Sequence, residues 1–500
     1  MIGFVKSAAL TGINAVEVSV EVDTAQGLPT EIIVGLPDAV VKESKSRIKS
    51  AIKNSGFHYP MKVYTINLGP AEIKKEGPFF DLPIAAAILI ATHQIQEFPQ
   101  PTLLVGELSL NGEIKPVKGI ISIAHLAYQK KIKNLIIPYD NFCEASIIKD
   151  LNIIPIKNLK ELARIDLNRK YSGPTNSDSQ VEKEILFDFL DVKGQLQAKR
   201  ALEIAASGNH NLLFIGSPGS GKTMLLKRLP SILPKMTMEE ALETNKIFSI
   251  SGKKIATSFT FARPFRDPHH TISYAGMVGG GQNPLPGEIS LAHNGVLFLD
   301  ELPEYPRNVL EILRQPMEEH KVTVSRANMV VEYPANFLLA AAMNPCPCGY
   351  YQDEKIKCCC QPSQIQKYLK KISGPILDRI DLIVSVPRLT KEELFEPTLI
   401  EQNQYTSSKI KNRVENARQI QEKRQKKPNA LMSHKEVENF CAIDDKIRLF
   451  LGKAIEKGYL SGRTFNKILK LSRTIADLEK SEIINLQHVS EAMQYRRVNI

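Results

Sequence analysis

The chain has 500 residues, of which 43% are hydrophobic, and a formal net charge of +11. This length exceeds what one hydrophobic core usually organises, so we expect two or three domains. The longest apolar run, Leu82 to Thr92, is about half of the ~20 residues that span a bilayer, which favours a core helix and no membrane partner. Residues 1–6 lack the pattern of a secretion signal, so we expect a cytoplasmic protein. The positive charge favours a polyanionic partner such as nucleic acid.

Composition and periodicity divide the chain into four parts. Residues 1–168 mix short strand-like and helical segments and predict an α/β domain. The polar, turn-rich stretch at 169–184 predicts a linker. Strands alternate with helices over 185–388, which is typical of a parallel sheet flanked by helices. Residues 389–500 have helical periodicity, and 409–427 combine an apolar with a basic face, which fits either a solvated helix of a lid or a contact with DNA.

A predicted phosphate-binding loop begins where the apolar strand Leu212–Ile215 ends. Glycines here let successive backbone N–H groups point at phosphate oxygens, the lysine reaches the β- and γ-phosphates, and the threonine hydroxyl binds Mg²⁺. Strand, loop and helix occur in the required order, which favours a nucleotide site over a chance glycine-rich turn. The predicted ATP-binding residues are Gly216, Ser217, Pro218, Gly219, Ser220, Gly221, Lys222 and Thr223.

Two further strands predict the catalytic groups of an ATPase. Val296–Leu299 ends in Asp300 and Glu301, which we expect at the carboxyl edge of the sheet beside the phosphate loop. Asp300 would hold Mg²⁺, and Glu301 would polarise the attacking water. The strand at 337–343 ends in Asn344, an amide suited to orient that water or to sense the γ-phosphate, although a plain strand-end asparagine gives the same pattern.

Five of the seven cysteines lie within residues 346–360. A cytoplasmic chain keeps its thiols reduced, so this clustering favours metal over disulfides. Four sulfurs suffice for tetrahedral Zn²⁺, and alternate residues in each arm can point the same way. The predicted zinc ligands are Cys346, Cys348, Cys358 and Cys360. Reduced, unliganded thiols are the alternative.

The order and the amino-acid sequences of these motifs resemble those of a known family. The segments at 191–195, 211–223, 294–301, 341–345 and 373–381 are similar to those of magnesium-chelatase-related AAA+ ATPases. Within that branch the chain resembles the bacterial ComM/YifB family over almost its whole length. The resemblance implies an AAA+ core of P-loop type at 185–388, with a parallel sheet between helices, and a C-terminal helical lid at 389–500.

The resemblance assigns roles that spacing alone does not. Arg379 matches the arginine finger, which reaches a neighbour's ATP, and Arg463 matches the second sensor arginine of the lid; a surface salt bridge is the alternative for each. Sites completed by a neighbour imply an oligomer, and the family precedent is a hexamer. Residues 321–331 alternate as a β-hairpin does and match the pore hairpin of related helicases. Lys321 and Arg326 there are candidates for DNA phosphate contacts, or for ordinary solvated charges.

Residues 1–168 resemble the proteolytic domain of Lon-type proteases through the segments 75–79 and 105–120. Cleavage in that fold needs a serine activated by a lysine. Phe79 and Ile121 stand in those positions here, so we expect no protease activity. The basic residues of this domain are candidates for contacts with DNA or a neighbouring subunit; they are Lys74, Lys75, Lys115 and Lys118.

The sequence therefore predicts an ATPase that uses ATP and Mg²⁺. By resemblance, it would be a hexameric DNA motor with helicase or branch-migration activity, acting on single-stranded or branched DNA during natural transformation and homologous recombination. The alternative is a magnesium-chelatase-like ATPase that remodels a protein partner.

Overall fold

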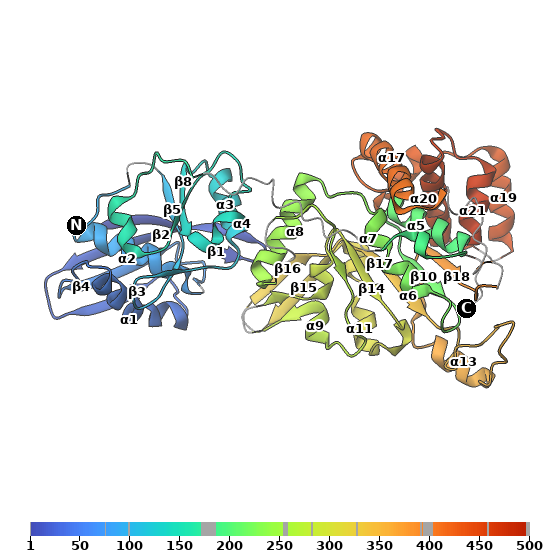
Figure 1. The fold of residues 1–500 in the computed structure, drawn as a ribbon, viewed down its shortest axis with the longest axis horizontal. Helices are drawn as coiled ribbons and strands as arrows, with labels where there is room; N and C mark the ends of the chain where they lie inside the picture. Colours follow the sequence, from blue (N-terminus) through green and yellow to red (C-terminus); the bar gives the residue numbers. More distant parts are fainter. Residues whose placement is uncertain are drawn as a thin grey trace. The chain divides into compact units, whose positions relative to one another are not determined.

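The computed structural model describes residues 2–75, 77–98, 101–171, 187–253, 259–281, 284–326, 329–390, 393, 404–457 and 460–496. The chain forms two compact units, which are described separately (Figure 1). The N-terminal unit consists of Met1–Val181 and Glu239–Thr260, and the C-terminal unit of Glu182–Met238 and Phe261–Ile500. Most of the linker predicted at 169–184 lies outside the described residues.

A seven-stranded mixed sheet forms the centre of the N-terminal unit, with strand order β3-β4-β2-β1-β5-β8-β9. Its antiparallel part pairs β1 with β2 and β2 with β4, whereas β5, β8 and β9 run parallel. The strands are β1 (Gly3–Thr11), β2 (Asn14–Ala25), β3 (Thr30–Val34), β4 (Val63–Gly69), β5 (Thr102–Leu104), β8 (Asn134–Pro138) and β9 (Asn152–Ile156).

The apolar run near residue 82 forms α2 (Asp81–Ala91), and every residue of this helix is buried. It packs on β1 and β2, so the prediction of a core helix is confirmed. The amphipathic helix α1 (Ala39–Asn54) buries one face in the same core, and α3 (Ile120–Gln129) is buried there over most of its length. These layers give the α/β fold that the sequence predicts for this part of the chain.

Helix α8 (Met238–Ser251) belongs to the N-terminal unit although it follows the phosphate-binding loop in the chain. Leu242 packs against the N-terminal core, and the backbone N–H of Gly119 donates to Ser249 O at 3.2 Å. The sequence did not predict this return, because the apolar pattern of α8 does not indicate which sheet covers it. The chain therefore passes between the two units at three places.

A five-stranded sheet of order β11-β14-β17-β10-β18 forms the C-terminal unit, and its strand pairs are all parallel. Every residue of the three central strands is buried, as expected for a parallel sheet covered on both faces. The strands are β10 (Leu212–Ile215), β11 (Phe265–Arg266), β14 (Val296–Leu299), β17 (Leu338–Met343) and β18 (Leu382–Ser385).

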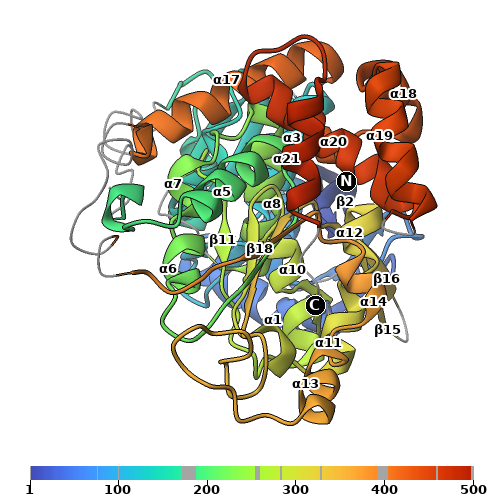
Figure 2. The ribbon, with the colours of Figure 1, turned by 90° about the vertical axis from the view of Figure 1, so that its right-hand side faces the viewer.

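The C-terminal helices share one hydrophobic core with this sheet. In α17, Ile410, Val414 and Ala417 are buried, which confirms the predicted amphipathic helix. Figure 2 shows these helices, coloured orange to red, gathered together. They are α17 (Ser407–Gln425), α18 (His434–Phe440), α19 (Asp445–Glu456), α20 (Gly462–Leu478) and α21 (Leu486–Gln494). Among the described helices, none combines the length and the apolar character that crossing a bilayer requires.

Candidate active site

The phosphate-binding loop links β10 to the short helix α6 (Lys222–Leu226). Gly219 and Gly221 have φ angles of +78° and +89°, which side chains with a Cβ rarely adopt. A Cβ on Gly216 would lie 2.2 Å from the carbonyl oxygen of Val386 at the end of the neighbouring strand. These positions require glycine, which lets the backbone curl tightly after β10.

Lys222 is buried inside this loop. Its Nζ donates to Gly216 O at 2.7 Å, to Ser217 O at 3.0 Å and to the Asn344 Oδ1 at 3.2 Å. Burial lowers the pKa of Lys222 to about 8, against the opposing pull of the Asp300 and Glu301 carboxylates. Lys222 therefore lies inside the loop that would surround a phosphate. Without a bound anion, its ammonium loses its proton at a lower pH than an ordinary lysine does.

The predicted Mg²⁺ ligands face each other. Thr223 Oγ1 donates to Asp300 Oδ2 at 2.8 Å across the gap between α6 and the end of β14. A hydroxyl and a carboxylate at this spacing are the hard oxygen ligands that Mg²⁺ prefers beside a triphosphate. The residues present therefore fit Mg²⁺.

Glu301 follows Asp300 in a left-handed conformation, with φ of +51°. Its backbone N–H donates to Asp300 Oδ1 at 2.9 Å, while its side chain is 58% exposed. The His270 Nδ1 lies 3.9 Å from the Glu301 carboxylate, a neighbour that the sequence did not connect with Glu301. The carboxylate is therefore open to water at the edge of the sheet.

Asn344 follows β17, the strand between β10 and β14. Since the carboxyl ends of parallel strands meet at one edge, Lys222, Asp300, Glu301 and Asn344 all lie at this edge. Thr223 lies at this edge as well, where it contacts Asp300. The structure thus brings together five predicted side chains of the nucleotide site.

Arg379 and Arg463 line a different cavity, of about 440 Å³. Asn211, which precedes β10, and Phe337, which precedes β17, line it as well. The cavity therefore lies at the amino edge of the sheet. A four-residue strand such as β10 is about 13 Å long, and this length separates the two arginines from the phosphate loop of their own chain.

Both arginines lie next to the end of a helix. Arg379 follows α14 (Gly374–Leu377), donates to Pro375 O at 2.6 Å and pairs with Glu318. Arg463 lies in the first turn of α20, which starts at the N-cap Ser461. The pKa of the Glu318 carboxylate is lowered, first by the hydrogen bond from Arg379 and also by the charge of Arg463. The sequence did not identify Glu318.

The predicted hairpin is confirmed as β15 (Lys321–Arg326) paired antiparallel with β16 (Met329–Pro334). The Lys321 ammonium pairs with Glu332 at 3.0 Å on the exposed surface of the hairpin. The side chain of Arg326 lies outside the described part of the structure.

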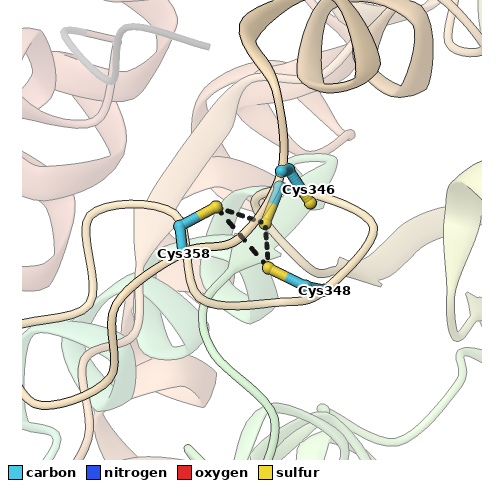
Figure 3. A group of neighbouring side chains, drawn as sticks. Cys346, Cys348 and Cys358 are labelled. Atoms are coloured by element: carbon cyan, nitrogen blue, oxygen red, sulfur yellow. Dashed lines mark hydrogen bonds between the residues drawn. The ribbon is translucent and has the colours of Figure 1, made fainter.

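The four predicted zinc ligands come together in the loop after β17. Cys346 Sγ lies 3.4 Å from Cys348 Sγ and 3.7 Å from Cys358 Sγ, and Cys348 and Cys358 are 3.5 Å apart (Figure 3). With Cys360 included, all four sulfurs lie within 4.8 Å of one another. Cys359 is exposed and is not part of this group.

In the N-terminal unit, Phe79 and Ile121 are buried. The rings of Phe79 and Phe80 pack with their centroids 5.0 Å apart. The prediction of Lys75 as a candidate for contacts with DNA or a neighbouring subunit is wrong, because Lys75 is fully buried and its ammonium donates to Pro70 O. Burial also lowers the pKa of Lys75.

Comparison with known proteins agrees with these features. A family model described as magnesium chelatase, subunit ChlI, matches residues 188–394. Models described as subunit ChlI of Mg-chelatase and as the ChlI C-terminal part match 20–141 and 404–496. The chain is 44% identical to the competence protein ComM of Haemophilus influenzae, over 99% of this chain and 97% of ComM. It is 43% identical to YifB of Escherichia coli, over 100% of this chain and 97% of YifB.

The chain belongs to the ComM/YifB family. It is also 31% identical to Lon protease 2 of Bacillus subtilis over 180 residues, which make up 32% of each chain. The predicted α/β architecture with a Lon-like part, a magnesium-chelatase-like AAA+ core and a helical C-terminal region is thus confirmed. This ComM/YifB-family protein is a magnesium-chelatase-like AAA+ ATPase, which uses ATP and Mg²⁺.

Proposed function

We propose that this protein is a hexameric ATP-dependent DNA motor with helicase or branch-migration activity. The observation that carries the proposal is its identity of 44% to a competence protein along nearly the full length of both chains. Its setting would be the cytoplasm, where incoming single-stranded or branched DNA is integrated by homologous recombination during natural transformation. The net charge of +11 is compatible with a DNA partner.

In this proposal the carboxyl edge of the sheet binds and hydrolyses ATP. The loop from Gly216 to Thr223 cradles the phosphates, and Lys222 contacts the β- and γ-phosphates. Thr223 and Asp300 would hold Mg²⁺, and the ion would supply positive charge beside the phosphate oxygens. Glu301 polarises the attacking water, and Asn344 orients it. The exposure of Glu301 and the hydrogen bond from Lys222 to Asn344 support these roles.

Arg379 and Arg463 would act on the nucleotide of a neighbouring subunit. Both arginines line the cavity at the amino edge, one strand length from the phosphate loop of their own chain. An arginine that reaches the γ-phosphate stabilises the charge that develops there during transfer. A ring of subunits is the closed arrangement in which every such edge meets a neighbour's nucleotide.

The hairpin β15–β16 would transmit the hydrolysis cycle to DNA. Lys321 and Arg326 stand on its two-stranded arm and would contact phosphates of the DNA backbone. Such contacts position DNA without reading its sequence, as a translocating motor requires.

A second candidate is an ATPase that remodels a protein partner. The match of residues 188–394 to a magnesium chelatase subunit favours this candidate. One experiment separates the two: ATP turnover with and without DNA, together with unwinding of forked and Holliday-junction substrates. We expect DNA to stimulate turnover and junctions to be resolved in an ATP-dependent manner. ATP turnover that is insensitive to DNA, without unwinding, would favour the protein-remodelling function.

A further inference from the structure

The cysteine cluster has the geometry of a tetrathiolate metal site. Zinc–sulfur bonds of about 2.3 Å in a tetrahedron place neighbouring sulfurs about 3.8 Å apart. The sulfurs of Cys346, Cys348 and Cys358 are 3.4 to 3.7 Å apart, within a few tenths of an ångström of that edge. Cys360 supplies the fourth sulfur. Figure 3 shows the three labelled sulfurs converging on one point.

Backbone groups around the cluster suit thiolates. The N–H of Tyr351 donates to Cys346 Sγ at 3.3 Å, an interaction that orients and stabilises a metal-bound sulfur. Gly349 follows Cys348 with φ of +85°, and its N–H closes a tight turn on Cys346 O at 3.0 Å. This turn directs Cys346 and Cys348 toward one centre, to which the second arm adds Cys358 and Cys360.

The segment between the two cysteine arms contacts the phosphate-binding loop through Asp353. The Asp353 Oδ2 accepts a hydrogen bond of 2.5 Å from Ser217 Oγ, and it pairs with Arg388 Nε at 3.1 Å. The Asp353 side chain is only 2% exposed. Its Oδ1 accepts two backbone N–H groups of its own segment, at Lys355 and Ile356. Asp353 thus joins the cysteine loop to the second residue of the phosphate loop.

Three more contacts reinforce this junction. A Cβ on Gly349 would lie 2.5 Å from Pro218 Cδ, so the cysteine turn packs directly against the phosphate loop. Arg388 Nη2 donates to Pro218 O at 3.3 Å, and its guanidinium lies 5.3 Å from the centre of the Tyr350 ring. The segment that the cysteines enclose therefore contacts the phosphate loop at Pro218 as well as at Ser217.

We propose that Cys346, Cys348, Cys358 and Cys360 bind one Zn²⁺ ion, and that the zinc-bound loop holds the phosphate-binding loop in its nucleotide-binding conformation through Asp353 and Gly349. The zinc fixes both ends of the segment that presents Asp353 to Ser217. It also anchors the chain two residues after Asn344, which contacts Lys222. The second half of the proposal rests on the nucleotide site described above.

The metal is tested on the full-length protein purified without chelator. We expect one equivalent of zinc by elemental analysis, and Co²⁺ in its place should give the intense d–d bands of a tetrahedral thiolate site. Cys358→Ser combined with Cys360→Ser should remove the metal, whereas the matched control Cys359→Ser should keep it. Zinc well below one equivalent in the unaltered protein, or disulfides among these cysteines found by alkylation and mass spectrometry, would overturn the metal site.

The link to the phosphate loop is tested by nucleotide binding, measured with a fluorescent ATP analogue in the absence of DNA. Asp353→Ala should retain zinc yet weaken binding by about tenfold, the scale of one lost hydrogen bond to a buried charge. Removal of zinc should weaken binding at least as much, while Cys359→Ser leaves it unchanged. Unchanged affinity both in Asp353→Ala and after zinc removal would overturn the link. This assay involves neither DNA nor turnover, so failure of the proposed motor function would not affect its outcome.

Discussion

The carboxyl edge of the five-stranded sheet gathers Lys222, Thr223, Asp300 and Glu301 around a glycine loop, whereas the amino edge surrounds a cavity with Arg379, Arg463 and Glu318. The first edge has acids, Lys222 and Arg388, and the guanidinium of Arg388 pairs with Asp353 and donates to Pro218 O. At the second edge Glu318 pairs with Arg379 and also feels the charge of Arg463. The phosphate loop and its acids lie at one edge and Arg379 and Arg463 at the other, which is the arrangement expected of an active site divided between subunits.

The largest expected effect tests this division directly. Glu301→Gln and Arg379→Ala should each lower ATP turnover by at least about 10²- to 10³-fold, through loss of water polarisation and of charge stabilisation. In an equal mixture of the two variants, about one quarter of the interfaces of a symmetric ring combine an intact Glu301 with an intact Arg379. Turnover of the mixture should therefore recover to about one quarter of the turnover of the unaltered protein.

Matched controls for this experiment lie nearby. Glu304→Gln removes an exposed carboxylate that pairs with Lys371, and Arg314→Ala removes a half-exposed arginine that pairs with Glu311. Both should keep turnover near that of the unaltered protein. A mixture of Glu301→Gln and Arg379→Ala that stays inactive, although the subunits exchange, would contradict an active site shared between the two edges.

A smaller effect belongs to the carboxyl edge alone. Burial lowers the pKa of Lys222 to about 8 in the nucleotide-free protein. Bound phosphates favour the ammonium, so binding takes up a proton once the pH exceeds this value. ATP affinity should be constant below pH 8 and fall about tenfold per pH unit above it. Calorimetric titrations between pH 7 and 9.5 measure this slope; Lys222→Arg, which stays charged, should show no slope in this range.

The hairpin is rooted at the amino edge, since His320 and Asn336 line the same cavity. The substitution Lys321→Ala on this hairpin should weaken DNA binding by a few-fold at moderate salt. The slope of log affinity against log salt concentration should also fall by about 0.7 to 0.9, the contribution of one phosphate contact. Fluorescence anisotropy over a salt series measures both quantities. Lys371→Ala serves as the control, and equal slopes for both variants would argue against a DNA contact at Lys321.

The smallest expected effect concerns Glu318, the carboxylate that pairs with Arg379 within one chain. Glu318→Gln removes the negative charge that pairs with Arg379 of the same chain. If Arg379 must leave Glu318 to reach a neighbour's nucleotide, turnover should rise by about two- to threefold, because an ion pair with an exposed carboxylate contributes about 1 kcal/mol. Steady-state turnover is the measurement. A decrease comparable with that of Arg379→Ala would instead mean that Glu318 positions the arginine for catalysis.

Local patterns in the sequence predicted much of the fold and of the nucleotide site. The run from Leu212 to Thr223 contains strand, loop and helix in one contiguous segment, so its conformation follows from neighbouring residues. Asp300 and Asn344 could be placed because carboxyl ends of parallel strands meet at one edge. The sulfurs of Cys346 and Cys358 meet through a short loop, which spacing anticipates.

Other features depend on residues far apart in the chain. Asp353 and Ser217, which are hydrogen-bonded, are separated by 136 positions. Burial of Lys75 and the return of α8 to the N-terminal unit also escaped prediction. A lysine has the same local pattern whether it is solvated or enclosed, and an amphipathic helix does not indicate which sheet covers its apolar face.

The sequence by itself determined the phosphate loop, the strand-end acids and the proximity of the cysteines, because backbone preference and side-chain periodicity act over a few neighbouring residues. Only the tertiary structure decided that the arginines lie at the amino edge and that the cysteine loop contacts the phosphate loop through Asp353. Those contacts arise when the whole unit closes around a shared core, and they depend on packing between segments that have no local relation.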